Sequence, residues 1–129
     1  MSSKLNDIGS LFIAEMIQPT TAIATSATSA GQDMSTCGVD CFGIQIIGTV
    51  SSTSVSLAGK FQESVTATGT YADVSNATFA AITSTTGSQI VQTVKFLRTL
   101  QFVRYVGTIA GTTPTIALDV LVGGMKVQA

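Results

Sequence analysis

The chain has 129 residues with a net charge of −1, six basic and seven acidic side chains, and no histidine. Only 10% of its residues are charged, against about 25% in typical soluble domains. The basic side chains are spread along the chain and do not cluster, which argues against nucleic-acid binding. No apolar run approaches a length of about 20 residues, which a helix needs to span a bilayer.

The N-terminal quarter predicts an arm followed by one or two short elements. Residues 1–7 are polar and predict a mobile or partner-docked arm, and residues 8–129 predict a single domain. Residues 8–17 fit a strand or a short helix, and Pro19 is expected to end that element. Residues 20–27 predict a second strand. Asp7 and Glu15 interrupt the apolar stretch, so no export signal is predicted.

The clearest early strand spans residues 39–50. Phe42, Ile44 and Ile46 fall on one face and Ile47 on the other, which indicates a central strand or one covered by a neighbour. After a turn, residues 55–65 alternate with period two. Leu57, Phe61 and Val65 share a face that is expected to be buried. This second pattern predicts a half-buried antiparallel strand.

The remaining chain consists of short strand-like segments separated by Gly, Ser, Asn and Pro. These segments are residues 71–74, 79–82, 89–97, 102–110 and 115–122. About eight strands with little helix predict an all-β fold. We expect an antiparallel β-sandwich, jelly-roll-like, in which two sheets bury their inner faces.

No residue combination in the chain predicts catalysis. The usual acid–base residue, histidine, is absent, and serine without an activating base is a poor nucleophile. Glu63 and Asp73 are the acidic residues expected to lie closest together, and we expect either to pair with Lys60 or Arg104 on a sheet surface. The chain is therefore not expected to be an enzyme, and no catalytic, cofactor-binding or metal-binding residue is predicted.

Two cysteines, Cys37 and Cys41, occur in the sequence CGVDC. Two thiols without histidine do not complete a usual four-ligand zinc site, and the spacing differs from the CxxC of redox catalysts. A disulfide between them would close only a short loop. The preferred interpretation is two small buried thiols at the entry of a strand, with a metal site shared between subunits as the alternative.

Two long runs resemble a known family. They are GKFQESVTATGTYADVSNATF, at residues 59–79, and LRTLQFVRYVGTIAGTTPTIALDVLVGG, at residues 97–124. The first resembles a strand–turn–aromatic phrase of tailed-bacteriophage virion proteins, and the second resembles their final hairpin. The most similar members are capsid decoration, or cement, proteins with a jelly-roll-like sandwich. The resemblance covers about residues 40–124. It departs at Tyr71, where relatives often carry Trp or Phe, and the N-terminal third has no counterpart.

The resemblance implies a structural virion protein that binds the outer surface of an assembled capsid. The implied partners are the major capsid protein and copies of the chain itself, as a homotrimer, with no cofactor. The implied location is the capsid surface, after assembly in the host cytoplasm. Two alternatives stay open: a tail-tube, connector or fibre-base protein, and a carbohydrate-binding or adhesin module. The absence of Trp and the presence of only two Tyr disfavour the adhesin module.

Overall fold

A computed structural model of the chain describes residues 12–23, 26–50, 55–83, 90–111 and 116–126. The described residues form strands and no helix. The strands are β1 (Phe12–Ile23), β2 (Ala27–Thr28), β3 (Gln32–Asp33), β4 (Cys37–Val50), β5 (Val55–Ser64), β6 (Ala72–Thr78), β7 (Ile82–Thr83), β8 (Ile90–Leu97), β9 (Phe102–Gly111) and β10 (Ile116–Lys126). The predicted arm, residues 1–7, lies outside the described residues.

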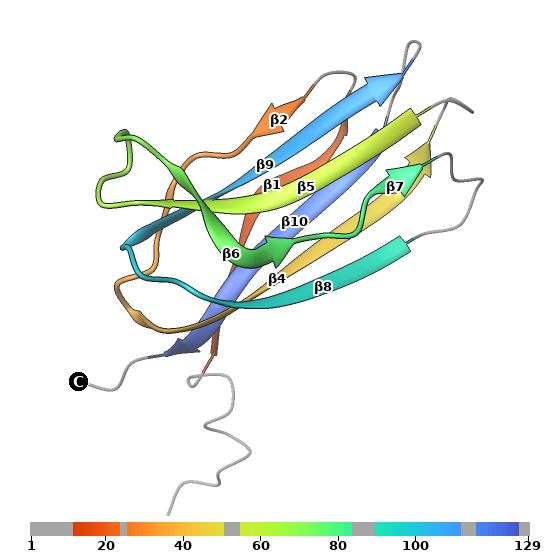
Figure 1. Ribbon diagram of the computed structural model, residues 1–129. Helices are drawn as coiled ribbons and strands as arrows, with labels where there is room; N and C mark the ends of the chain where they lie inside the picture. Colours follow the sequence, from red (N-terminus) through yellow and green to blue (C-terminus); the bar gives the residue numbers. More distant parts are fainter. Residues whose placement is uncertain (1–11, 24–25, 51–54, 84–89, 112–115, 127–129) are drawn as a thin grey trace, which may run out of the picture.

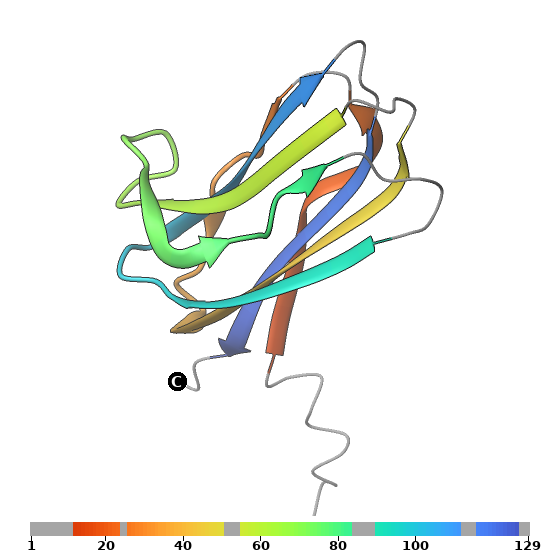
Figure 2. The same cartoon turned by 45° about the vertical axis from the view of Figure 1, so that its right-hand side comes forward.

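The strands form two antiparallel sheets that pack face to face (Figures 1 and 2). One sheet has the order β1-β10-β4-β8. The other has the order β2-β9-β5-β6, with β3 also beside β9 and β7 also beside β5. Because β2 and β3 share one edge position, and β6 and β7 share another, each sheet has four positions. Eight positions in this order make a jelly roll, so the predicted all-β sandwich is confirmed.

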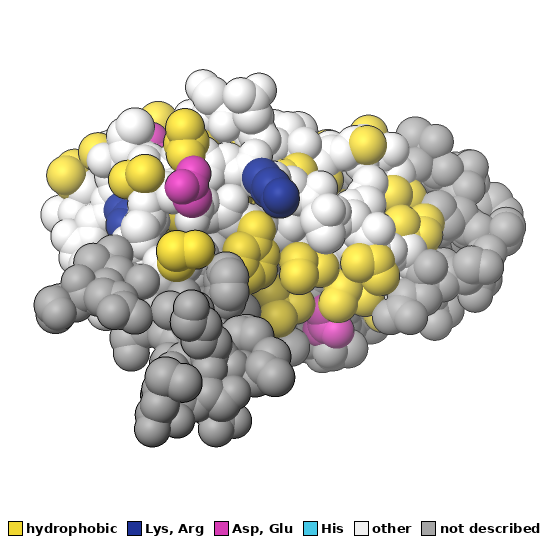
Figure 3. Space-filling model, turned by 90° about the horizontal axis from the view of Figure 1, so that it is seen from below, with side chains coloured by type: hydrophobic (Ala, Val, Ile, Leu, Met, Phe, Trp, Pro, Cys, Tyr) yellow, Lys and Arg dark blue, Asp and Glu magenta, His cyan; other side chains and the backbone are white. Residues whose placement is uncertain are grey.

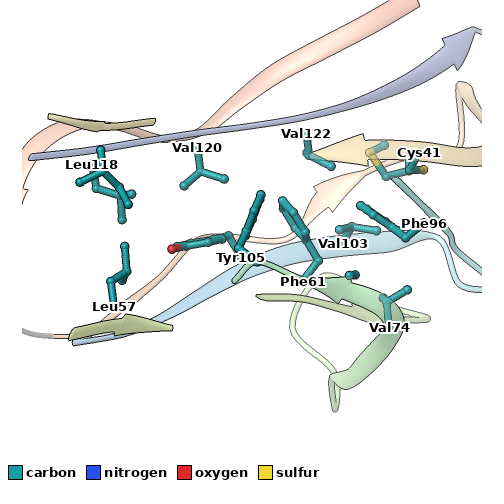
Figure 4. Packing of buried hydrophobic residues seen from close by; sticks show 14 of the residues in the cluster. Cys41, Leu57, Phe61, Val74, Phe96, Val103, Tyr105, Leu118, Val120 and Val122 are labelled. Atoms are coloured by element: carbon teal, nitrogen blue, oxygen red, sulfur yellow. The ribbon is translucent and has the colours of Figure 1, made fainter. Parts of the chain in front are cut away.

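The core lies between the sheets because the long strands alternate buried and outward side chains. On β10, Leu118, Val120 and Val122 are fully buried, and on β9 Val103 and Tyr105 are fully buried. Figure 4 shows the β10 side chains pointing toward the residues of the opposite sheet. Each such aliphatic side chain contributes about 1.5–3 kcal/mol when fully buried, so this interface is the main source of stability.

Phe61 of β5 fills the centre of the core. Its ring stacks on Phe96 with centroids 5.2 Å apart and meets Tyr105 edge-on at 5.9 Å. On the opposite sheet Gly43 makes room for this ring, since a Cβ at Gly43 would lie 2.1 Å from a Phe61 ring carbon. The glycine therefore allows the two sheets to approach closely at this point.

A chain of hydrogen bonds crosses the core beside Phe61. The Tyr105 hydroxyl donates to Gln45 Oε1 at 2.5 Å, and Gln45 Nε2 donates to Gln92 Oε1 at 2.7 Å. Gln92 Nε2 then donates to the carbonyl oxygen of Ala80 at 2.9 Å. Gln45 is fully buried, so these partners replace water. This series of hydrogen bonds links the two sheets and fixes their position relative to each other.

The predicted break at Pro19 is wrong, because β1 continues through it from Phe12 to Ile23. β1 is an edge strand, and its pairing with β10 shifts register between Gln18 and Thr21. An edge strand tolerates proline at an irregularity, where its missing N–H interrupts no ladder bond. Residues 8–17 and 20–27 are thus not separate elements: residues 12–23 are one strand, and the two-residue β2 follows.

The predicted burial of Val65 is also wrong, since this side chain is 68% exposed. β5 ends at Ser64, and the exposed residues 65–70 form the turn that leads to β6. The period-two pattern of the strand does not extend into that turn. Ser64 is buried instead, and its hydroxyl accepts the backbone N–H of Thr66 at 3.3 Å.

Candidate functional site

The two sheets present unlike outer faces. The outer side of β4 carries Phe42, Ile44 and Ile46, which are half-buried although no described strand covers them. The outward side chains of the flanking strands are Val91, Thr93, Lys95 and Leu97 on β8, and Ala117, Asp119, Leu121 and Met125 on β10. We call the outer side of β8, β4 and β10 the apolar face.

The register of the strands makes the apolar face continuous. Ile44 lies between Thr93 of β8 and Leu121 of β10. At the edges of the face Val91 is 59% exposed, Leu97 62% and Met125 54%. These three side chains are large, apolar and exposed, and the side chains beside them are also apolar. Together they form a contiguous apolar patch, which is uncommon on the surface of a monomeric protein. The sequence pattern predicted a central or covered strand here, and β4 is central in its sheet.

Charged side chains on the apolar face are few. Asp40 and Lys95 are exposed at the end where β8 and β10 finish, and Asp119 is half-buried farther along. Figure 3 looks at the molecule from below, where hydrophobic side chains gather around isolated charged ones. A surface of this kind loses little electrostatic solvation when a partner covers it.

The outer face of the other sheet carries a polar network. Lys60 forms a salt bridge to Asp73 at 3.0 Å, as predicted for this pair of residue types, and Gln62 also donates to Asp73 at 2.8 Å. Arg104 donates to Gln62 and lies over the Tyr71 ring, 4.1 Å from its centroid. These groups are exposed or partly exposed, so water screens the charges in each contact. They give this face exposed charged and polar groups.

Glu63 lies one position from Asp73 in the register of β5 and β6, close to it as expected, but its carboxylate bonds elsewhere. Its carboxylate accepts the Thr99 hydroxyl at 2.7 Å, the Thr99 N–H at 2.8 Å and the Leu100 N–H at 3.2 Å. Burial alone would raise the pKa of Glu63, but these hydrogen bonds outweigh burial and hold the pKa below its usual value. Glu63 thus secures the turn between β8 and β9.

A groove of about 660 Å³ lies at the end of the sandwich beside Asp40. Phe42, Lys95 and Met125 belong to the apolar face, and Ser75 and Asn76 come from β6 of the other sheet. The lining residues are Asp40, Cys41, Phe42, Ser75, Asn76, Lys95, Phe96, Leu97, Gly124 and Met125. The groove therefore extends the apolar face around the end of β8.

Arg98 anchors the entry to β4, a role that sequence analysis missed. Its guanidinium donates to the carbonyl oxygens of Met34, Cys37, Gly38 and Leu100 at 2.6–3.1 Å. Charge-assisted hydrogen bonds of this kind are about twice as strong as neutral ones. A single arginine after a strand carries no sequence signal for such a role, because three of its four acceptors are backbone groups about 60 residues away.

Cys37 and Cys41 lie where this anchored segment enters β4, and both side chains are buried, as predicted. Burial raises the pKa of the Cys41 thiol to about 11, so the thiol stays protonated at neutral pH. The described part of the chain holds no group of three or more His, Cys, Asp or Glu residues placed to bind a metal ion. Within the same residues no helix is long and apolar enough to cross a membrane.

The comparisons with known proteins bear on the fold. No protein-family model matches the chain, and no curated protein matches its sequence. Among solved structures, the SPBc2 prophage-derived protein YomS aligns with a TM-score of 0.53 and 13% identity, over 88% of this chain and 93% of that one. This similarity is one of fold.

Two further structures align over similar lengths. A Bacillus endospore appendage protein of disulfide-linked pili aligns with a TM-score of 0.47 and 15% identity, over 92% of this chain and 90% of that one. The Eiger TNF of S. frugiperda aligns with a TM-score of 0.47 and 10% identity, over 92% of this chain and 94% of that one.

Proposed function

We propose that the chain is a structural virion protein, which binds the outer surface of an assembled phage capsid and stabilises it as a decoration protein. The observation that carries the proposal is the difference between the two outer faces. The apolar face exposes large hydrophobic side chains, which a bound partner would remove from water. The opposite face exposes the charged and polar side chains of the network around Asp73. A module with these two faces binds by contact and needs no catalytic group.

Two further observations support a phage origin. The runs at residues 59–79 and 97–124 resemble those of phage decoration proteins. The fold is shared with YomS, a prophage-derived protein. The partners in this proposal are the major capsid protein and further copies of the chain, as a homotrimer, on the surface of the virion.

The stabilisation follows from mass action. A protein that binds the assembled shell and not its free subunits shifts the equilibrium toward the shell. At a concentration 100-fold above Kd the shift is about 2.7 kcal/mol per site. Three linked copies would bind more tightly than one, because the second and third contacts are effectively intramolecular. No bond is made or broken in this mechanism.

Co-sedimentation with assembled capsids of the encoding phage tests the proposal. The informative variant is Ile44→Lys, which places a charge at the centre of the apolar face. Val106→Lys is the matched control, since Val106 is also half-buried and outward on a central strand, but on the opposite sheet. Circular dichroism and melting curves verify that both variants fold.

We expect wild type and Val106→Lys to pellet with capsids, and Ile44→Lys to bind at least tenfold more weakly. Failure of the wild-type chain to bind capsids, together with binding to purified tail tubes, would refute the decoration role. Equal capsid binding by both variants would show that the apolar face is not the contact.

A further inference from the structure

The edges of the two sheets differ in how well they are protected against strand addition. An open edge presents unpaired N–H and C=O groups, and proteins usually blunt it with bulges, proline, charges or very short strands. The edge strand β1 carries Pro19 and two register shifts. The opposite sheet is edged by β2 and β3, of two residues each, and by β6 and β7, where Asn76 adopts a φ of 62° beside a register shift. Three of the four edges are therefore interrupted.

The fourth edge, β8, is regular. Its residues from Ile90 to Leu97 pair one-to-one with β4, without a register shift, and no described strand pairs with its other side. It contains no proline, and Lys95 is its one charged residue. Its outward side chains include Val91 and Leu97, at 59% and 62% exposed. β8 is thus the edge best suited to accept another strand.

We propose that β8 pairs antiparallel with β8 of a second copy across a two-fold axis. The register that fits places Val94 opposite Val94 of the second copy. Val91 then lies opposite the other copy's Leu97, so that the two most exposed apolar side chains of the strand cover each other. Lys95 lies opposite Thr93, which avoids like charges across the pair.

The neighbouring registers fit less well. A pairing centred on Lys95 brings two ammonium groups directly opposite each other, which is destabilising. A pairing centred on Thr93 sets Val91 against Lys95 and leaves Leu97 beyond the end of the partner strand. Hydrophobic matching and charge thus select the same register, and an interface of this kind is isologous, with each copy contributing the same residues.

The outward side chains of β8 are exposed along the strand, at Val91, Thr93, Lys95 and Leu97. Its inner side is covered near the middle, where Gln92 donates to Ala80, but the groove opens beside Lys95 and Leu97. Pairing would join the two sheets into one, with both apolar faces on the same side. This contact goes beyond the proposed function, because it uses the edge of the sheet and leaves both apolar faces uncovered.

Sedimentation of the purified chain tests the contact without any capsid. The double variant Val91→Lys/Leu97→Lys puts charges on the edge, and Val65→Lys is the control, because Val65 is 68% exposed but lies outside β8. We expect the double variant to have half the mass of wild type at a given concentration, and the control to match wild type. Three results would overturn the proposal: an unchanged mass in the double variant, a mass in the double variant that is one third of the wild-type mass, or a wild-type chain that is monomeric.

A cross-linking experiment tests the register. Val91→Cys protein mixed with Leu97→Cys protein should form a disulfide-linked dimer on mild oxidation, with the linkage identified by mass spectrometry of peptides. Val91→Cys alone should not, because the two copies of residue 91 lie about six residues apart along the strands, or about 20 Å. Equal cross-linking in both samples would overturn the register. Capsid binding plays no part in either experiment, so their failure is distinguishable from failure of the proposed function.

Discussion

Removal of the Tyr105 hydroxyl tests the polar link through the core. Tyr105→Phe keeps the ring and its packing but deletes the donor to Gln45 Oε1. Gln45 is 0% exposed, so no water replaces the lost partner. A buried acceptor left without a donor costs about 1–3 kcal/mol. With an unfolding entropy of about 2.1 cal/mol/K per residue, a loss of 2 kcal/mol lowers Tm by about 7 °C for this chain.

Thermal and denaturant unfolding measure this effect, and Tyr71→Phe is the control. The Tyr71 hydroxyl donates to the Ala67 carbonyl at an exposed position, so its loss should change stability by less than about 0.5 kcal/mol. The double variant Gln45→Leu/Tyr105→Phe should be more stable than the sum of the single losses predicts, because it removes both partners together. A Tyr105→Phe protein as stable as Tyr71→Phe would refute the reasoning.

Two further predictions concern Gly43 and Glu63. Gly43→Ala should destabilise by about 1–3 kcal/mol through overlap with Phe61, whereas Gly48→Ala on the same strand meets its nearest atom at 3.4 Å and should change little. Equal denaturation midpoints of the two variants would contradict this. Because the folded pKa of Glu63 is lowered, its stabilising effect is present above its usual value of 4.5 and is lost as pH falls through the lower folded pKa. As the pH is lowered through this range, the free energy of unfolding should therefore fall less for Glu63→Gln than for wild type, since Thr99 no longer holds a carboxylate. Identical pH profiles of the two proteins would argue against this role of Glu63.

The sequence predicted what depends on neighbouring residues. The two-sided apolar pattern of β4 placed Ile44 and Ile47 on opposite faces, as the structure has them, because side-chain direction in a strand depends on period alone. Val65 was misplaced because the same period does not reveal where a strand ends. Pro19 was misinterpreted because a sequence does not say which strand lies at an edge.

The candidate surfaces depended on pairing, which sequence patterns do not specify. The apolar face exists because β8, β4 and β10 are neighbours, although they are far apart in the chain. Arg98 reaches backbone oxygens near Met34, and backbone acceptors leave no trace in residue type. The salt bridge of Lys60 and Asp73 was predictable, since a single turn joins their strands.

The pairing of β1 with β10 affects how the protein is made. Phe12 lies opposite Met125, so this contact joins residues 113 positions apart (125 − 12). Folds dominated by such distant contacts have a high contact order and fold slowly. During synthesis β1 leaves the ribosome well before its partner β10. Until then β1 and β4 have no β10 between them, and aggregation of nascent chains competes with completion of the sheet.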